Sequence, residues 1–256
     1  MRDPKNTLLE LAHHILAQHP ELSSALGQLL FKRSGKSFFD ANLLLALNET
    51  LLETSKSQLR QDLFVLAELG HKENGYFVEF GATDGVTLSN TYLLEKSFQW
   101  KGILVEPAKV WHQRLKTNRT AIIDTRCVWK VSGENVAFNE TANAEFSTVE
   151  THSFNDMHAE TRRHGQQYDV LTVSLMDLLE EHNAPREIDY LSIDTEGTEL
   201  EILEQFDFQK YRVRIITCEH NNTPMKARLE ALFQGNGFSK KHEGLSQFDG
   251  WWVLQS

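Results

Sequence analysis

Short apolar runs alternate with helical stretches from Tyr76 onward, and this alternation leaves very few fold classes open. The runs are four or five residues long, at 76–80, 102–105, 127–131, 189–193 and 214–218. Their length and their Val, Ile and aromatic content are typical of buried strands. Segments with helical spacing fill the intervals, at about 89–98, 111–116, 174–181 and 198–206. Strand alternating with helix predicts βαβ units, and therefore an α/β fold with a mostly parallel sheet.

The two ends of the chain depart from this alternation. Near the carboxyl end, a helix at 226–233 and runs at 237–238 and 250–254 predict two closing strands. Ser57 precedes good helix formers and Gly70 follows them, which predicts a helix from an N-cap at Ser57 to Leu69. Leu and Ala recur at three- and four-residue spacing over 6–56, which predicts three further helices. We therefore divide the chain into a helical N-terminal segment, 1–56, and a main domain, 57–256.

Charge and hydropathy narrow the classes of partner. The formal net charge is -10, and an acidic surface repels phosphate backbones, so we expect no nucleic-acid partner. No apolar run approaches the roughly 20 residues of a membrane span, and the first residues lack the pattern of a secretory signal. A cytoplasmic location is the resulting expectation. Cys127 and Cys218 each fall in a strand-like run, which favours buried free thiols over a disulfide.

Acidic residues gather where the predicted strands end. In parallel sheets, ligands bind beyond the carboxyl ends of the strands. The residues at or just past those ends are Glu79, Gly81, Glu106, Asp194, Glu196 and Glu219. One acidic residue after a strand is usually a cap or a solvated loop residue, but a set at matching ends points to a binding site.

The same residues argue against phosphate-binding loops. A dinucleotide fingerprint that starts at Gly81 requires glycine at 83 and 86, where this chain has Thr83 and Val86. No P-loop motif occurs. Carboxylates also repel a diphosphate, which needs backbone donors and a positive dipole. The acidic residues at the strand ends instead suit a phosphate-free, cationic nucleoside such as S-adenosylmethionine.

The position of each of these residues in the sequence indicates which part of the cofactor it can bind. Glu106 lies 25 residues after Gly81 (106 minus 81) at a strand end, where a carboxylate can accept both ribose hydroxyls. Glu79 and Asp84 are suited to the ammonium or sulfonium group. Gly81 and Gly85 allow close approach of the backbone, although each can equally be a plain turn glycine.

Several motifs in order carry a family resemblance. They are Ser57-Gln58-x-x-Gln61-Asp62, Phe77-Val78-Glu79-Phe80-Gly81-Ala82-x-Asp84-Gly85, Ser89-Asn90-Thr91, Gly102-Ile103-Leu104-Val105-Glu106-Pro107, Asn118-Arg119, Asp194-Thr195-Glu196-Gly197-x-Glu199 and Glu219-His220-Asn221. With these motifs the sequence resembles the FkbM family of S-adenosylmethionine-dependent methyltransferases. The resemblance implies a class I methyltransferase (Rossmann-like) fold, a mostly parallel seven-stranded sheet with a reversed last strand.

The resemblance also implies a cofactor site and an acceptor. The implied cofactor-binding residues are Gln61, Glu79, Gly81, Asp84, Ser89, Asn90 and Glu106. Family members methylate hydroxyls, often on sugars, which implies a sugar, glycolipid or glycosylated metabolite as acceptor. A polar insertion at about 147–169 is placed to contact it.

Two readings remain open for the chemical step. Asp194 is the first candidate for a general base, followed by Glu219 and His220. The alternative is that Asp194 and Glu196 only hold backbone donors of their loop. Asp194 and Glu219, with Asn221, also offer the hard oxygen ligands that suit Mg²⁺, which would lower the pKa of the acceptor hydroxyl.

The sequence thus predicts an O-methyltransferase that uses S-adenosylmethionine, with Mg²⁺ as a second candidate cofactor and a small molecule or glycan as substrate. The alternative is a non-catalytic scaffold with the same fold, which engages a partner through residues 1–56. Those residues also offer a surface for a homodimer. Loss of cofactor binding on replacing Glu106 separates the enzyme from the scaffold.

Overall fold

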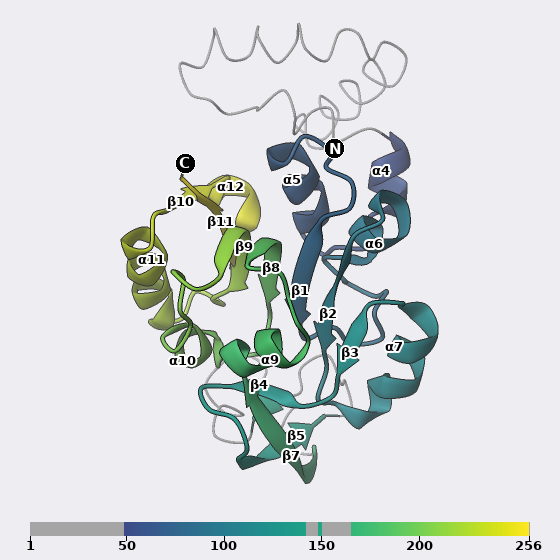
Figure 1. Cartoon of the computed structure of the whole chain (residues 1–256), viewed down its shortest axis with the longest axis vertical. Coiled ribbons are helices and arrows are strands. Elements are labelled where there is room, and N and C mark those ends of the chain that lie inside the picture. Colours follow the sequence, from purple (N-terminus) through teal and green to yellow (C-terminus); the bar gives the residue numbers. More distant parts are fainter. Residues whose placement is uncertain (1–48, 142–147, 150–164, 256) are drawn as a thin grey trace, which may run out of the picture.

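The computed structural model describes residues 49–141, 148–149 and 165–255, and its centre is a seven-stranded sheet (Figure 1). In spatial order the strands are β10 (Phe238–Lys241), β11 (Asp249–Leu254), β9 (Arg212–Glu219), β8 (Glu187–Ile193), β1 (Tyr76–Phe80), β2 (Lys101–Val105) and β3 (Ile122–Asp124). The pairs from β9 to β3 are parallel, and β11 is antiparallel to both β9 and β10. The predicted α/β class with a reversed last strand is confirmed.

The central strands match the sequence prediction with one exception. Residues 76–80, 102–105, 189–193 and 214–218 all fall within strands of this sheet. The strand predicted at 127–131 is wrong in its extent and its placement, because β4 (Cys127–Trp129) ends at Trp129 and pairs with β7 (Gln166–Ser174) in a second sheet. The strand that follows β2 in the main sheet is β3, a three-residue edge strand with an exposed Ile122, too short to show as an apolar run.

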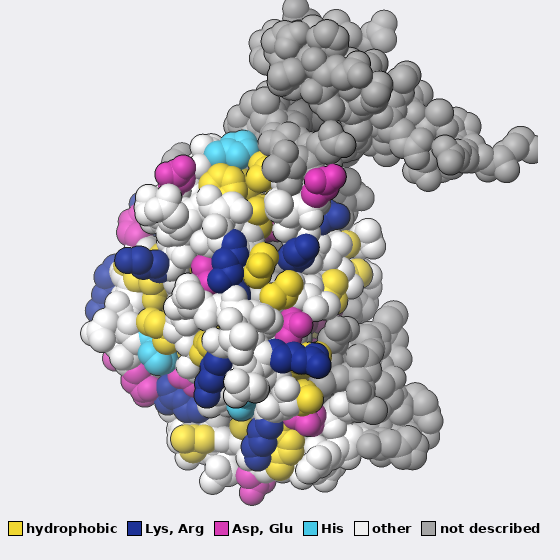
Figure 2. Space-filling view, turned by 90° about the vertical axis from the view of Figure 1, so that its right-hand side faces the viewer, with side chains coloured by type: hydrophobic (Ala, Val, Ile, Leu, Met, Phe, Trp, Pro, Cys, Tyr) yellow, Lys and Arg dark blue, Asp and Glu magenta, His cyan; other side chains and the backbone are white. Residues whose placement is uncertain are grey.

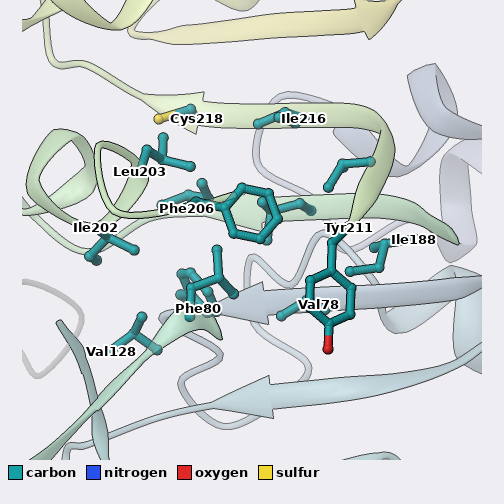
Figure 3. Close-up of a cluster of buried hydrophobic side chains, with 14 of the residues drawn as sticks. Val78, Phe80, Val128, Ile188, Ile202, Leu203, Phe206, Tyr211, Ile216 and Cys218 are labelled. Atoms are coloured by element: carbon teal, nitrogen blue, oxygen red, sulfur yellow. The ribbon is translucent and has the colours of Figure 1, made fainter. Parts of the chain in front are cut away.

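Helices cover both faces of the sheet. Successive strand residues point to opposite sides, so each pair divides between the two cores: Phe77 and Val78, Tyr190 and Leu191, Ile215 and Ile216, Trp251 and Trp252. One core includes α5 (Gln61–Glu68), α6 (Tyr92–Phe98) and α7 (His112–Asn118). The other includes α9 (Leu175–Glu181), α10 (Glu199–Leu203) and α11 (Met225–Gly235), and Figure 3 shows part of it around Phe80 and Phe206. Both cysteines are buried free thiols, as predicted.

Two helices begin later in the chain than predicted, and in both cases a residue before the helix makes hydrogen bonds of another kind. The N-cap of α5 is Arg60, with a φ of 67°, while the Ser57 hydroxyl accepts the amide of Gln61 from outside the helix. α6 begins at Tyr92 rather than at 89, because the amide of Asn90 and the hydroxyl of Thr91 are hydrogen-bonded to Glu79 instead.

A second, four-stranded sheet lies beyond the carboxyl ends of the central strands. Its order is β4, β7, β5 (Asn135–Glu140) and β6 (Thr148–Val149). Its own small core includes Trp129, Phe138 and Val170. Figure 1 shows β4, β5 and β7 at the lower end of the molecule, opposite α5. Part of the predicted polar insertion therefore forms strands, and its remainder lies outside the described residues.

Most of the helical N-terminal segment falls outside the described residues, and of its three predicted helices only α4 (Glu49–Thr54) can be described. Within the described ranges, no helix combines the length and the apolar character needed to cross a bilayer. Figure 2 shows lysine and arginine side chains scattered over the face that carries α6 and α7, without merging into one patch.

Candidate active site

A cavity of about 370 Å³ lies at the carboxyl ends of β1, β2, β8 and β9. Its wall contains seven of the ten predicted site residues: Gln61, Glu79, Gly81, Asn90, Glu106, Asp194 and Glu219. Asp84, Ser89 and His220 are not part of that wall. Cys127, Val128 and Phe138 from the second sheet close the cavity with apolar surface. The parallel topology thus brings together residues that are more than 150 positions apart in the sequence.

Gly81 makes the tightest backbone approach in the site. It has a φ of 71°, and a Cβ at this position would lie 2.2 Å from the carbonyl oxygen of Asp194. Its amide donates to the carbonyl of Val105 (3.1 Å), so that group is already engaged. Gly81 therefore serves the site by having no side chain, which lets the ends of β1 and β8 come together.

Glu106 is held by two backbone amides. Its Oε2 accepts from the amide of Thr83 (2.7 Å), and its Oε1 accepts from the amide of Ala108 (2.7 Å). The side chain is buried, and burial raises its pKa to about 7 even though both hydrogen bonds act to lower it. Each oxygen keeps a further lone pair, so the carboxylate can accept hydroxyl groups from the cavity.

Glu79 organises the loop between β1 and α6. Its carboxylate accepts from the amide of Asn90 (2.7 Å) and from the hydroxyls of Ser89 (3.1 Å) and Thr91 (2.5 Å). With these bonds it fixes residues 89–91, and it reaches the cavity only as part of the wall. Ser89, predicted to bind the cofactor, is itself buried as part of this hydrogen-bonded loop.

A buried arginine holds the same loop from the other side. The Arg119 guanidinium donates to the Glu95 carboxylate (2.8 Å), the Gly85 carbonyl (3.0 Å) and the Thr91 hydroxyl (2.8 Å). It also lies 3.7 Å from Glu79. Its side chain has no exposed surface. Burial by itself would raise the pKa of Glu95, but the Arg119 charge and several hydrogen bonds lower it overall.

Asp84 closes a turn instead of facing the cavity. Its Oδ1 accepts from the amides of Val86 (2.9 Å) and Thr87 (2.8 Å), and its Oδ2 accepts from the Thr87 hydroxyl (3.2 Å). This is the local hydrogen bonding that aspartate often supplies in turns. The predicted contact of Asp84 with a cationic group has no support in this geometry.

A polar network joins the start of α5 to the far side of the cavity. The Gln61 side-chain amide donates to Asp249 (2.7 Å), and the Ser57 hydroxyl donates to the Asn90 side chain (2.6 Å). The Asn90 amide in turn donates to the Ser192 hydroxyl (3.0 Å). Gln61 and Asn90, both predicted cofactor residues, therefore also fix the cavity wall.

Carboxylates dominate the end of the cavity formed by β8 and β9. Asp194, Glu196 and Glu219 each offer an oxygen within 4.8 Å of the others. Burial raises the pKa of Asp194 and of Glu219 well above the usual values, and the neighbouring carboxylates raise both further. Such mutual repulsion means that the pair releases its protons only with difficulty unless a positive charge is supplied.

His220 follows Glu219 but turns away from the cavity. Its Nδ1 accepts from the amide of Asn222 (3.1 Å), which places the proton of the neutral ring on Nε2. Burial, with help from Lys226 and Lys240, lowers its pKa to about 4. Asn221, the next residue, does line the cavity. Sequence order alone could not tell which of the two faces inward.

Asp249 is the functional candidate that sequence reasoning missed. It begins β11, pairs with Glu219 across the sheet, lines the cavity and is buried. Burial raises its pKa to about 6. The parallel topology predicts acidic residues only at the carboxyl ends of the parallel strands, whereas Asp249 lies at the amino end of an antiparallel strand. The reversed last strand was the signal that would have found it.

Three buried carboxyl groups predict that stability falls as the pH rises. Burial raises the pKa of Asp62 and Glu106 to about 7 and that of Asp249 to about 6. A raised pKa in the folded state means that the folded state binds the proton more tightly, so the stabilisation is complete below the unfolded pKa and is lost through the folded pKa. We expect the free energy of unfolding, measured with urea, to decrease from pH 5 to pH 8.

Asp62→Asn tests this directly, since Oδ2 of Asp62 is buried without a hydrogen-bond partner. The variant is expected to have a shallower slope of stability against pH than the wild type. Asp169→Asn, at an exposed position, is the matched control and should keep the wild-type slope. Stability that rises over this range in the wild type contradicts the prediction.

The chain matches one family model and is similar in fold to several solved structures. The family model described as the methyltransferase FkbM domain matches residues 79–240. Methyltransferase FkbM from Methylobacillus flagellatus KT is similar in fold, with a TM-score of 0.50, 11% identity and coverage of 94% of this chain. This chain spans only 60% of that protein. No curated protein sequence matches.

Two further solved structures are more distant. The O-methyltransferase from Bacillus cereus in complex with SAH has a TM-score of 0.45 and 11% identity, covering 90% of this chain and 97% of its own. The METTL16 MTase domain has a TM-score of 0.44 and 15% identity, covering 93% of this chain and 82% of its own.

Proposed function

Because the chain belongs to the methyltransferase FkbM family, we propose that it is an S-adenosylmethionine-dependent O-methyltransferase. The acceptor in this proposal is a hydroxyl of a sugar, a glycolipid or a glycosylated metabolite. The position of Glu106 carries the proposal: its carboxylate lies in the cavity wall, just after β2, held by two backbone amides. A carboxylate at this point of a Rossmann-like fold is suited to accept ribose hydroxyls.

The rest of the cavity suits the cofactor in shape and charge. Gly81 lets the ends of β1 and β8 come together, and Val128 and Phe138 offer an apolar wall for an adenine ring. The carboxylates at the end of β8 and β9 favour a cationic sulfonium over a phosphate. Within the predicted cofactor set, Asp84 and Ser89 support the loop, while Gln61, Glu79 and Asn90 form wall.

Methyl transfer requires alignment and a place for one proton. The acceptor oxygen forms a bond to the methyl carbon, the carbon–sulfur bond breaks with its electron pair left on sulfur, and the hydroxyl proton passes to a base. Alignment supplies much of the rate, and the base about 10² to 10⁴-fold. Asp194 and Glu219 line the cavity and have raised pKa values, so we assign the proton to this pair instead of His220.

Glu106→Gln is the test of cofactor binding. Hydrogen bonds to a charged group are worth about 1.5–3 kcal/mol, so we expect S-adenosylhomocysteine to bind the variant about 10- to 100-fold more weakly in calorimetry. Burial raises the pKa of Glu106 to about 7, and the charged form is the better acceptor. Wild-type affinity should therefore weaken as the pH falls from 8 to 6, whereas that of the variant stays flat.

Glu73→Gln is the control, because Glu73 is exposed before the amino end of β1, at the opposite edge of the sheet from the cavity. It should bind the ligand as the wild type does. A wild-type protein that shows neither binding nor a thermal shift with S-adenosylmethionine overturns the enzyme and leaves the scaffold hypothesis.

A further inference from the structure

A carboxylate triad stands apart from the ribose side of the cavity. It consists of Asp194 and Glu196, in the loop after β8, and Glu219, the last residue of β9. β8 and β9 are neighbouring parallel strands, with Ile193 paired to Cys218, so both strands deliver their acidic residues to the same point. All three residues of the triad line the cavity.

The loop that carries two of these residues is held in a fixed shape. Glu196 has a φ of 58° and Gly197 a φ of 116°, so the chain turns sharply at this point. Oε1 of Glu199 accepts from the amides of Thr195 (3.0 Å) and Gly197 (3.1 Å). These bonds present Glu196 towards Asp194 and Glu219 by local structure, at the expense of a left-handed backbone at a residue other than glycine.

Glu219 supplies an independent sign that a ligand belongs here. Its side chain is nine-tenths buried, and its Oε2 has no hydrogen-bond partner. The charges that act on Glu219 are those of Asp194, Glu196, Glu199 and Asp249, which are all carboxylates. Asp194 lies among Glu196, Glu199 and Asp249, and Glu219 is its hydrogen-bond partner. A buried carboxylate oxygen that accepts no hydrogen bond and is surrounded by other carboxylates is stabilised when a cation binds beside it.

We infer that Asp194, Glu196 and Glu219 together bind one divalent cation of the Mg²⁺ or Mn²⁺ class. The donor set contains only oxygen, which such cations prefer over nitrogen or sulfur sites. Octahedral Mg²⁺ with ligands at about 2.1 Å separates them by about 3.0 to 4.2 Å, and the three carboxylates offer oxygens within 4.8 Å of one another. A cation held by these three residues would lie at the cavity wall. Binding of the cation stands by itself, and its use on an acceptor hydroxyl rests on the proposed function.

Manganese binding to the full-length, chelator-treated protein tests this inference without any assay of activity. We expect Mn²⁺, followed by electron paramagnetic resonance and calorimetry, to bind at one site and to be displaced by Mg²⁺. Glu196→Gln and Glu219→Gln should each weaken Mn²⁺ at least tenfold. Glu187→Gln, exposed at the other end of β8, is the matched control and should bind as the wild type does.

One further measurement keeps the outcome unambiguous. Each variant is titrated with S-adenosylhomocysteine, which has no positive sulfur, and unchanged affinity shows that the cavity is intact.

Absence of Mn²⁺ binding in a wild type that binds S-adenosylhomocysteine overturns the cation site and leaves the proposed function standing. Weaker S-adenosylmethionine binding by Glu196→Gln, with no Mn²⁺ site in the wild type, assigns the triad to the sulfonium instead. If the wild type does not bind S-adenosylhomocysteine, the result counts against the proposed function and not against the cation site.

Discussion

Gly81→Ala is expected to abolish detectable binding of S-adenosylhomocysteine and to destabilise the domain. The added Cβ would lie 2.2 Å from the carbonyl oxygen of Asp194, which is a backbone atom and cannot rotate away. The left-handed φ of 71° adds strain for any residue with a side chain. Left-handed backbone costs about 1–2 kcal/mol and overpacking about 1–3 kcal/mol, so we expect the free energy of unfolding to fall by about 2–5 kcal/mol.

The same clash connects stability to function. Relief requires the ends of β1 and β8 to separate, which moves Glu79 and Asp194 apart and changes the cavity between them. We expect the affinity for S-adenosylhomocysteine, measured by calorimetry, to fall at least 100-fold. Gly235→Ala is the control, because nothing lies within 4 Å of its added Cβ at the end of α11, and it should be neutral or slightly stabilising. Wild-type affinity in Gly81→Ala would falsify the close approach as a requirement of the site.

The central sheet could be predicted because its strands are buried on both faces. A strand such as β1 or β8 that packs helices on both sides must be apolar at almost every position, and that run is visible without knowing its neighbours. The second sheet gave a weaker signal. In β7 only residues 169–172 alternate between exposed and buried, and the polar residues before them belong to the predicted insertion. β3 is short and lies at the edge, so its few residues did not need to be apolar.

The candidate site could be predicted as far as parallel topology determines it. Gly81, Glu106, Asp194 and Glu219 all follow parallel strands, and one rule placed them together. The rule does not state which way a side chain points after the strand ends, so Asp84 and His220 were expected at the cavity and face elsewhere. Those directions depend on turn geometry and on hydrogen bonds to distant residues.

The sequence motif around Glu79 has a structural role. The sequence predicts that Glu79 meets a cationic ligand, and the structure places the Arg119 guanidinium 3.7 Å from it. The two residues hold one loop between them, through Ser89 and Thr91. Asn90, in the middle of that loop, is part of the cavity wall. The pair therefore shapes the cavity from behind it.

Arg119→Met is accordingly expected to destabilise the domain by about 3–5 kcal/mol, the usual effect of breaking a buried ion pair and leaving its partner uncompensated. The variant takes the arginine from the buried carboxylates of Glu79 and Glu95, of which Glu95 keeps its pair with Lys96 (3.1 Å), and it removes donors to the loop. Urea unfolding measures the change. Where the variant does not fold, Thr91→Val removes one hydroxyl from the same network and should lose about 1 kcal/mol or more.

Arg228→Met provides the contrast, because its ion pair with Glu204 (2.6 Å) is largely exposed. Exposed pairs contribute about 0–1 kcal/mol, so this variant should unfold close to the wild-type midpoint. Both arginines form an ion pair of ordinary length. The difference between the losses of unfolding free energy in the two variants therefore measures the effect of burial. If Arg119→Met and Arg228→Met lose the same stability, the Arg119 network does not hold the loop, and the loop at 89–91 must be fixed by Glu79 and the surrounding backbone alone.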